Sequence, residues 1–379
     1  MLSVGPPSFS TSSTASRCWA EIDLGAVRDN VATIRQQSAA GVEIMAVVKA
    51  NAYGHGVAPV VSALRDDVEM FGVANLAEAR ELKAQVSPRR IFILGPALSE
   101  ERQEIAESGF VPAVSSYEEA AAYSLFVGPT GRMALHLAVD TGMGRIGAWE
   151  GDALAVAEAI AGLPRVALEG LATHLPVADE DDAFTRAELE RFDGLVKELA
   201  SRGVRPQRVH SENSAGVIGF PQHAGNLVRV GLALYGSSPR PECQDRVRAA
   251  LTWKTRVTLV RDLGPGRGVS YGRTFVTPRR MQVATLAVGY ADGYQRHLSG
   301  RGAEVLLRGQ RCPVLGRVTM DQIMVDVSGV TKVEEGEEVV LIGRQAQEQI
   351  TVAELAAKAG SIPWEIFTGI GSRVARHYV

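Results

Sequence analysis

Eight short apolar runs, separated by segments with helical periodicity, lie between residues 44 and 231 of this 379-residue chain. Strands that alternate with helices in this way form parallel βα units, and eight such units close a (β/α)₈ barrel. The sequence therefore predicts an α/β protein with an N-terminal (β/α)₈ TIM barrel over residues 18–245. The expected strands are Ile44–Val48, Met70–Ala74, Ile91–Gly95, Phe110–Val114, Met133–Val139, Ala167–Thr173, Arg208–Ser211 and Leu227–Gly231.

The sequence changes character after about Arg240. A Gly264-Pro265-Gly266 turn appears, and short β-type runs follow one another at close spacing. This pattern predicts a second, mostly β domain over residues 246–379. Its expected elements are strands at Thr255–Val260, Gln282–Val288, Glu304–Leu307, Met324–Val327 and Glu338–Ile342, and a helix at Val352–Ala359. Residues 1–17, rich in Ser, Thr and Pro, are predicted to be a disordered tail without the features of a secretory signal.

Composition excludes several classes of function. The net charge is only −3 and no dense Lys/Arg block occurs, which argues against nucleic acid and anionic membrane as partners. No apolar run reaches the roughly 18 residues needed to span a bilayer. The three widely spaced cysteines, Cys18, Cys243 and Cys312, suggest neither a disulfide framework nor a metal site. They fit a cytoplasmic protein.

The segment Ala46–Gly56 delivers Lys49 at the end of the first expected strand, with Tyr53 four residues later. One interpretation is a strand-end lysine that reaches for water. The other is a partly desolvated amine with a lowered pKa, as Schiff-base chemistry requires, because only the neutral amine attacks a carbonyl. Its position favours the second, since barrel enzymes carry their active sites at the C-terminal ends of the strands.

Four more side chains follow other expected strands at the same face. Arg145 lies in the glycine-rich loop Asp140–Gly147 and suits a carboxylate or phenolate, or it is a solvated residue of a tight turn. His174 is either a satisfied core histidine or a partner of Arg229. Ser214 lies at the expected start of a short helix. Its hydroxyl would either bind a phosphate or serve only as the N-cap of that helix. Arg229 lies inside an apolar strand, where its charge needs a partner.

Taken together, these motifs resemble the alanine racemase family of pyridoxal-phosphate enzymes, which combine a barrel with a β domain. The resemblance runs from about Trp19 to the C-terminus. It rests on Ala46–Gly56, the Arg145 loop, the Arg229 strand, the turn Val269–Thr274 and the segment Gly316–Val325, which occur in the family's order. The segment around Lys49 is the most specific of them.

The resemblance implies roles for the barrel residues. Lys49 would hold pyridoxal 5′-phosphate covalently, and Arg145 would bind the phenolic oxygen and the substrate carboxylate. Arg229 would face the pyridine nitrogen; because an arginine cannot accept that nitrogen's proton, it favours racemisation over side reactions. The implied cofactor-binding set is Lys49, Tyr53, His174, Ser214, Arg229, Gly231, Leu232 and Trp364.

The resemblance also implies a homodimer with shared active sites. Tyr271 would come from the partner subunit as the second base, opposite Lys49, with His174 linking it toward Arg229. Met320, also from the partner subunit, would offer its backbone N–H to the substrate carboxylate. The implied access route to the site is lined by Asp179, Tyr290, Arg296, Arg317 and Ile362. The expected reaction is two-base interconversion of L-alanine and D-alanine, which supplies D-alanine for peptidoglycan.

Two departures from the family pattern bear on substrate choice. Ala138 stands where the family usually has a lysine, often carbamylated, that steadies the arginine corresponding to Arg145. Trp364 stands where the family has a tyrosine that narrows the pocket. They leave open a serine or broad-specificity racemase. A non-catalytic pyridoxal-phosphate-binding protein is a further alternative, although Tyr271 would then have no task. A third alternative is a decarboxylase of the same barrel type. Such an enzyme would carry an acidic residue opposite the pyridine nitrogen, and Arg229 at that position argues against it.

Overall fold

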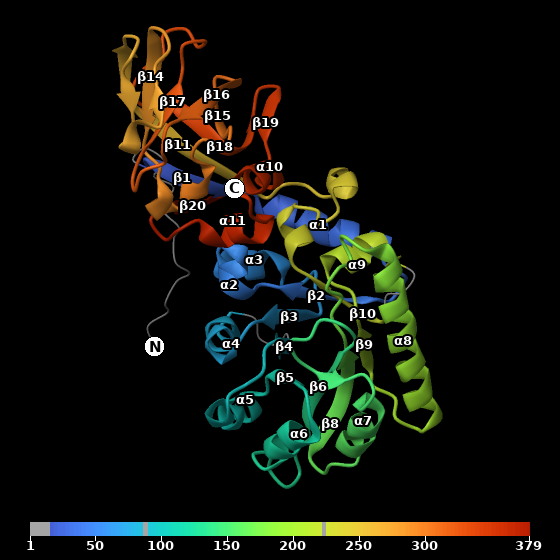
Figure 1. Ribbon diagram of the computed structural model, residues 1–379. Coiled ribbons are helices and arrows are strands. Elements are labelled where there is room, and N and C mark those ends of the chain that lie inside the picture. Colours follow the sequence, from blue (N-terminus) through green and yellow to red (C-terminus); the bar gives the residue numbers. More distant parts are fainter. Residues whose placement is uncertain (1–15, 86–89, 222–224) are drawn as a thin grey trace, which may run out of the picture. The chain divides into compact units, whose positions relative to one another are not determined.

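The computed structural model describes residues 16–85, 90–221 and 225–379 (Figure 1). The predicted tail lies outside the described residues except for its last two positions. The chain divides into two compact units. We name them the barrel unit, Ile22–Leu251 with residues 378–379, and the C-terminal unit, Thr252–His377 with the described residues up to Glu21.

The barrel unit is built on one sheet of parallel strands in the order β10-β2-β3-β4-β5-β6-β8-β9. The two ends of this order are joined, because the Asn226 N–H donates to the Val209 carbonyl at 3.1 Å. The predicted (β/α)₈ barrel is therefore confirmed. Its strands are β2 Glu43–Val47, β3 Met70–Val73, β4 Arg90–Ile93, β5 Val111–Val114, β6 Met133–Asp140, β8 Val166–Ala172, β9 Arg208–His210 and β10 Leu227–Val230, and β7 Ala148–Trp149 pairs with β6.

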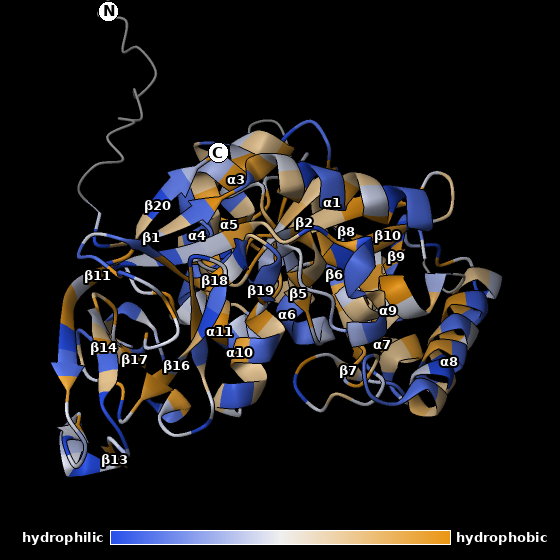
Figure 2. Ribbon diagram, turned by 90° about the horizontal axis from the view of Figure 1, so that it is seen from above, coloured by the Kyte–Doolittle hydropathy of each residue, from blue (hydrophilic) through white to orange (hydrophobic). Residues whose placement is uncertain are grey.

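Apolar side chains from neighbouring strands fill the inside of the barrel. Parallel register places Met45 opposite Met70, and both pack in one buried cluster with Phe92, Val111 and Leu227. Figure 2 shows hydrophobic residues concentrated along these strands. Such continuous apolar runs are expected where both faces of a strand are buried, which explains why the strands could be recognised in the sequence.

Helices surround the barrel strands (Figure 1). Several begin at side-chain caps: Asp23, Asn75, Ser116 and Asp181 each accept a hydrogen bond from a backbone N–H of the first turn. These caps fix where each βα loop ends. The helices are α1 Leu24–Gln37, α2 Lys49–Tyr53, α3 Val57–Leu64, α4 Leu76–Lys83, α5 Arg102–Ser108, α6 Tyr117–Ser124, α7 Ala153–Ala161, α8 Asp182–Ser201 and α9 Ser214–Gly219.

The C-terminal unit is mostly β, as predicted. Its main sheet has the order β19-β18-β15-β16-β17-β14-β11-β1-β20. The strands are β1 Cys18–Ile22, β11 Leu251–Leu263, β14 Met281–Leu286, β15 Glu304–Leu307, β16 Gln310–Leu315, β17 Ile323–Asp326, β18 Glu338–Gln345, β19 Glu348–Ile350 and β20 Ala375–Tyr378, with a separate pair, β12 Gly268–Val269 and β13 Phe275–Val276. Two helices follow, α10 Val352–Ala359 and α11 Pro363–Gly369.

Four strands of this sheet, β1, β16, β19 and β20, were not expected from the sequence. β1 lies in the part of the chain assigned to the barrel, yet it pairs with β11 and β20. β16 contains Pro313, which lacks an N–H and weakens the strand signal.

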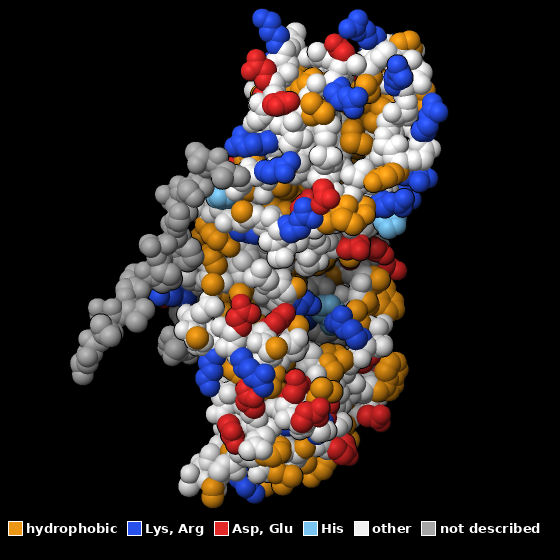
Figure 3. All heavy atoms as spheres, turned by 90° about the vertical axis from the view of Figure 1, so that its left-hand side faces the viewer, with side chains coloured by type: hydrophobic (Ala, Val, Ile, Leu, Met, Phe, Trp, Pro, Cys, Tyr) orange, Lys and Arg blue, Asp and Glu red, His pale blue; other side chains and the backbone are white. Residues whose placement is uncertain are grey.

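The surface of the barrel unit is mixed in charge. On the face shown in Figure 3, acidic and basic side chains are interspersed, without a field of one sign. Over the described ranges, no helix is both long and apolar enough to cross a membrane.

Candidate active site

Five of the candidate side chains lie where barrel strands end. Lys49 follows β2, Arg145 lies in the loop after β6, and His174 follows β8. Ser214 comes after β9, and Arg229 is in β10 itself. Parallel strands direct all their C-terminal ends to one face of the barrel, so residues far apart in sequence meet there.

The chain turns sharply after Lys49. Ala50, Asn51, Ala52 and Tyr53 all have positive φ, between 51° and 54°. Four successive L-residues in this left-handed region are strained, because Cβ approaches the following carbonyl. The turn closes with hydrogen bonds from Ala52 N to Val48 O and from Gly54 N to Ala50 O, at 2.8 and 2.9 Å. It brings the Tyr53 side chain back into the core, where it is buried.

Ser214, Gly231 and Tyr53 form a small cradle. The Ser214 hydroxyl oxygen accepts hydrogen bonds from Gly231 N and Ala233 N, at 3.1 and 3.3 Å. A Cβ at Gly231 would lie 2.4 Å from the Tyr53 hydroxyl oxygen, so a side chain there would displace the Tyr53 phenol. The plain-cap interpretation of Ser214 is wrong, because the cap of α9 is Asn213, whose side chain accepts from Ala215 N and Gly216 N.

Arg229 is buried and held by backbone carbonyls. Its guanidinium donates to the carbonyls of Thr173, His210 and Ser211, at 2.6, 2.9 and 3.0 Å. It also contacts two histidine rings, His210 Nδ1 at 2.7 Å and His174 Nδ1 at 3.4 Å. Because arginine only donates, both ring nitrogens must accept. His174 is therefore a partner of Arg229.

The electrostatics of this face are positive. Burial first, and then Arg145, lower the pKa of Lys49, against the opposing effect of Glu78. Burial, Arg229, Arg145 and Lys49 lower the pKa of His174 to about 3, so its ring is neutral at physiological pH. Burial also lowers the pKa of Arg229 to about 10, with Glu212 opposing and Arg145 adding. An anionic group bound here would relieve the mutual repulsion of these cations.

The Arg145 loop is ordered by Asp140. The Asp140 carboxylate accepts from Gly142 N and Gly144 N, both at 3.0 Å. Arg145 itself is exposed, and no ion pair to it is found within the described residues. Ala138 of β6 offers only a methyl group, so the loop is held by the Asp140 carboxylate at the end of the same strand.

Comparison with known proteins assigns most of the chain to one family. The sequence profile "Alanine racemase, N-terminal domain" matches residues 22–239, and "Alanine racemase, C-terminal domain" matches residues 250–378. Alanine racemase of Symbiobacterium thermophilum is 46% identical over 365 residues, which are 95% of this chain and 96% of the relative. The chain belongs to the alanine racemase family.

Solved structures of the family share the fold. A crystal structure of alanine racemase from Bacillus anthracis with bound L-Ala-P has a TM-score of 0.87 at 35% identity, covering 97% of this chain and 96% of that one. Alanine racemase from Bartonella henselae, with covalently bound pyridoxal phosphate, has a TM-score of 0.88 at 28% identity, covering 96% and 100%.

In the C-terminal unit, the segment that resembles the family's second base presents Tyr271 on a strained loop. Ser270 and Arg273 have φ of 65° and 47°. The Ser270 hydroxyl donates to the Arg317 carbonyl at 2.5 Å, and a Cβ at Gly272 would lie 3.1 Å from Arg317 Nη1. Tyr271 is 71% exposed. The loop therefore holds the phenol out from the unit.

The other family-implied residues are divided between the units. Tyr290 and Met320 lie on adjacent loops, since Tyr290 N donates to Thr319 O and Ala291 N to Met320 O, at 2.9 and 3.0 Å. Arg296 belongs to the 3₁₀ turn Arg296–Leu298, and α11 carries Trp364 just after the exposed Ile362. Asp179 is exposed in the barrel unit, just before α8.

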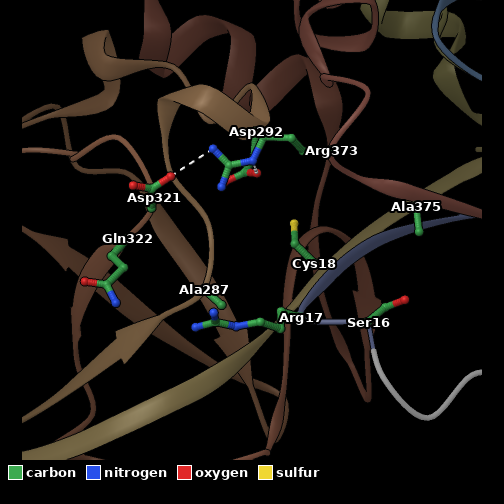
Figure 4. Close-up of a pocket in the computed structure, with 9 residues that line it drawn as sticks. All are labelled: Ser16, Arg17, Cys18, Ala287, Asp292, Asp321, Gln322, Arg373 and Ala375. Carbon is green, nitrogen blue, oxygen red and sulfur yellow. Dashed lines mark hydrogen bonds and ion pairs between the residues drawn. The ribbon is translucent and has the colours of Figure 1, made fainter.

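A cavity of about 360 Å³ in the C-terminal unit holds none of the predicted site residues (Figure 4). Arg373 there pairs with Asp321 and Asp292, at 2.8 and 3.2 Å. Burial raises the pKa of the Cys18 thiol to about 12, so this sulfur is a poor nucleophile. The cavity is lined by Ser16, Arg17, Cys18, Ala287, Asp292, Asp321, Gln322, Arg373 and Ala375.

Sequence reasoning missed two residues that contact this face. The first residue is His210, whose Nδ1 accepts a hydrogen bond from Arg229. The available signal was its position near the C-terminal end of the expected strand Arg208–Ser211. The second residue is Glu78, whose carboxylate accepts from Ala50 N at 2.9 Å. The signal was its place three residues after Asn75, which is the spacing of a capping box.

Glu188 of α8 lies buried beside the Arg145 loop with its carboxyl oxygen 3.2 Å from the Thr141 hydroxyl. The Thr173 hydroxyl, which donates to Val139 O, also contacts the Thr141 hydroxyl. Burial raises the pKa of Glu188 to about 7, against the lowering effect of the Thr141 hydroxyl and of Arg191.

We expect Glu188→Gln to stabilise the protein in mildly alkaline solution relative to acidic solution. The folded pKa lies above the unfolded one, so the contribution of Glu188 to stability is full below pH 4.5 and is lost as pH rises through about 7. Glutamine does not titrate, and the variant should gain about 1–2 kcal/mol over the parent between pH 5 and pH 8, allowing for solvent screening. Denaturant unfolding at both pH values measures this. Exposed Glu190→Gln is the control, and an equal response of both variants would refute the prediction.

Proposed function

We propose that this protein interconverts L-alanine and D-alanine with pyridoxal 5′-phosphate held by Lys49. The observation that carries the proposal is the gathering of Lys49, Arg145 and Arg229 around His174 in one positively charged site at the C-terminal face of the barrel. Membership of the alanine racemase family supports it, as does the covalently bound cofactor of the Bartonella henselae relative. D-alanine formed in this way would serve peptidoglycan synthesis.

The chain's residues fit a phosphorylated pyridine. Tyr53, Ser214 and the backbone at Gly231 and Leu232 would hold the phosphate, because glycine leaves room for close approach and the burial-raised pKa of Tyr53, about 12, keeps its hydroxyl a donor. Trp364 offers one indole N–H, the donor that remains where the family has a tyrosine. When bound, pyridoxal phosphate stabilises negative charge at the Cα of an amino acid attached to it.

Lys49 has two tasks in this scheme. Its lowered pKa keeps part of the amine population neutral, which is needed both to hold the cofactor and to remove a proton from Cα. Arg145 would bind the substrate carboxylate through its planar guanidinium, together with the backbone N–H of Met320. Arg229, fixed by three carbonyls, would donate to the pyridine nitrogen and leave it unprotonated.

The opposite face of Cα needs a second base, and we assign it to Tyr271 of the partner subunit in a homodimer. His174 would link that phenol toward Arg229. The exposure of large side chains on the C-terminal unit supports a partner: Tyr290, Met320 and Ile362 are 42%, 52% and 55% exposed. These, with Arg296, Arg317 and Asp179, would line the access route. The free thiols of Cys18, Cys243 and Cys312 are compatible with a cytoplasmic location.

The direct test is a chiral assay of the purified chain with added pyridoxal phosphate. We expect L-alanine to become a racemic mixture. Failure to convert alanine, by a folded protein that binds the cofactor, would reject the proposal.

A second candidate, a serine or broad-specificity racemase, rests on Trp364 and Ala138. Because tyrosine is the family's residue at this position, we expect Trp364→Tyr to lower the ratio of kcat/KM for serine to that for alanine by about tenfold if Trp364 confers the broader range, the usual effect of one small group in a pocket. Parallel measurements with alanine, serine and lysine decide the substrate range. An unchanged ratio would show that Trp364 does not shape the pocket.

A further inference from the structure

The left-handed turn after Lys49 needs an external restraint. Four residues, Ala50 to Tyr53, are all held at positive φ without a glycine among them. Such backbone persists only where the surroundings over-determine it. The turn is also where the direction of the Lys49 side chain is set, since Lys49 is its first residue.

Glu78 supplies that restraint from the neighbouring βα loop. One carboxylate oxygen accepts from Ala50 N at 2.9 Å, and the other accepts from Ala74 N at 2.8 Å. The Asn75 side chain accepts from Glu78 N at 3.1 Å, which fixes the first turn of α4. Ala50 directly follows Lys49, and Ala74 directly follows β3. The carboxylate therefore ties the ends of two adjacent barrel strands together.

The same motif occurs elsewhere in the barrel without this second bond. At α6, Ser116 accepts from Glu119 N at 3.2 Å, and Glu119 accepts from Ser115 N at 2.5 Å. In the described residues, no hydrogen bond from Glu119 to another βα loop is found. Capping a helix thus requires only one oxygen of such a glutamate. The bond from Glu78 to Ala50 is additional to capping, and it acts on the residue next to Lys49.

The charge of Glu78 also acts on the Lys49 amine. Among the groups that shift the pKa of Lys49, burial and Arg145 lower it, whereas Glu78 raises it. Glu78 is thus a negative group that opposes the cationic surroundings of this amine.

We propose that Glu78 is a positioning residue for the reaction, which fixes the left-handed turn through Ala50 and so aims the Lys49 amine. The proposal rests on the proposed function, in which Lys49 holds the cofactor and moves the Cα proton. Glu78 touches neither substrate nor cofactor in this scheme. Its effect is exerted through the backbone next to Lys49 and through its charge.

The test compares Glu78→Gln with Glu119→Gln in the full-length protein. Each variant disturbs one capping box, but only the first disturbs the bond to Ala50. Kinetics of the cofactor-loaded enzyme should show a loss in kcat of about ten- to a hundredfold for Glu78→Gln, as small misplacements of catalytic groups cause, with little change in KM. Glu119→Gln should retain its kcat, while the melting temperatures of both variants report any loss of stability.

A second readout does not depend on activity. The full chain freed of cofactor is labelled with acetic anhydride across a pH series, and the Lys49 peptide is quantified by mass spectrometry. The labelling midpoint should move to lower pH in Glu78→Gln and stay in place in Glu119→Gln. Glu78→Asp keeps the charge but shortens the reach, so its midpoint should stay near the parent's while kcat falls.

Equal behaviour of the two glutamine variants in kcat and in labelling would overturn the proposal. So would an unchanged kcat in a folded Glu78→Gln protein. These outcomes differ from failure of the proposed function, which would appear as undiminished racemisation after loss of Lys49 itself. The labelling midpoint reports the effect of Glu78 on Lys49 whether or not the proposed function is correct.

Discussion

Lys49→Ala is expected to lower the rate of alanine racemisation by about 10³-fold or more, the scale of a lost acid–base group, with further loss from weakened cofactor binding. The amine has no substitute, because the cation that acts on it is Arg145, and arginine does not give up its proton in proteins. The chiral assay measures the rate, and dialysis followed by visible spectroscopy measures retained cofactor.

Lys83→Ala is the matched control. Lys83 lies in the last turn of α4 and is exposed, so we expect full activity and retained cofactor. The thermal unfolding of Lys49→Ala should change little, since alanine leaves the strained turn and its hydrogen bonds in place. Activity equal to the parent's would refute the assignment of Lys49.

The same experiment separates the enzyme from a non-catalytic pyridoxal-phosphate-binding protein. A carrier would bind the cofactor through Lys49 and lose it on substitution, but the parent chain would not racemise any amino acid tested. An enzyme loses both properties together. Cofactor retention and turnover must therefore be measured on the same samples.

The barrel could be predicted from the sequence because its signals are local. Strands buried on both faces give apolar runs, and turn formers and caps such as Asn75 and Ser116 end them. The predicted ends lie within two residues of the observed ones: the expected strand Ile91–Gly95 is Arg90–Ile93, and Leu227–Gly231 is Leu227–Val230.

Features that depend on contacts distant in sequence could not be predicted. The N-terminal strand β1 pairs with β20, more than three hundred residues away, as in the bond from Val379 N to Ile22 O at 2.9 Å. Nothing in the composition of residues 18–22 distinguishes that partner from a barrel strand. A pattern of apolar residues shows that a segment pairs, without showing with which strand.

The candidate site could be predicted only in part, because some of its contacts also join residues distant in sequence. Strand order alone brings Arg229 and His174 to one face, so their contact could be expected. The left-handed turn of Ala50 to Tyr53 could not be expected, because such φ values are rare for L-residues and are imposed here by tertiary bonds. The contact of Glu78 with Ala50 could not be expected either, because helical periodicity identifies the exposed face of α4 without showing that its first turn lies against the neighbouring βα loop.

Tyr271→Phe is expected to lower racemisation of alanine in both directions by about 10²–10⁴-fold, the usual contribution of a positioned acid or base. The two enantiomers have equal free energies, so no variant can change one direction alone at equilibrium. Phenylalanine keeps the ring and removes only the hydroxyl. Tyr117→Phe, an exposed tyrosine on α6, is the control and should retain full activity.

Hydrogen exchange at Cα shows which face each base serves. In deuterated water, Tyr271→Phe with Lys49 intact should still exchange the Cα proton of one enantiomer without inverting it, because one base can remove a proton and return a deuteron on the same face. The other enantiomer should exchange far more slowly. Exchange that fails equally for both enantiomers, or unaltered racemisation, would contradict the two-base scheme.

Mixing the two inactive variants tests whether the site is shared between subunits. If Lys49 and Tyr271 of one site come from different chains, a heterodimer of Lys49→Ala with Tyr271→Phe has one site with both substitutions and one with neither. Random exchange of equal amounts makes half of the dimers hetero, so about a quarter of the parent activity should return in a two-fold symmetric assembly. A site built within one chain would leave every site damaged, and mixing would restore nothing. Recovery therefore requires that each subunit supply one base to its partner's site.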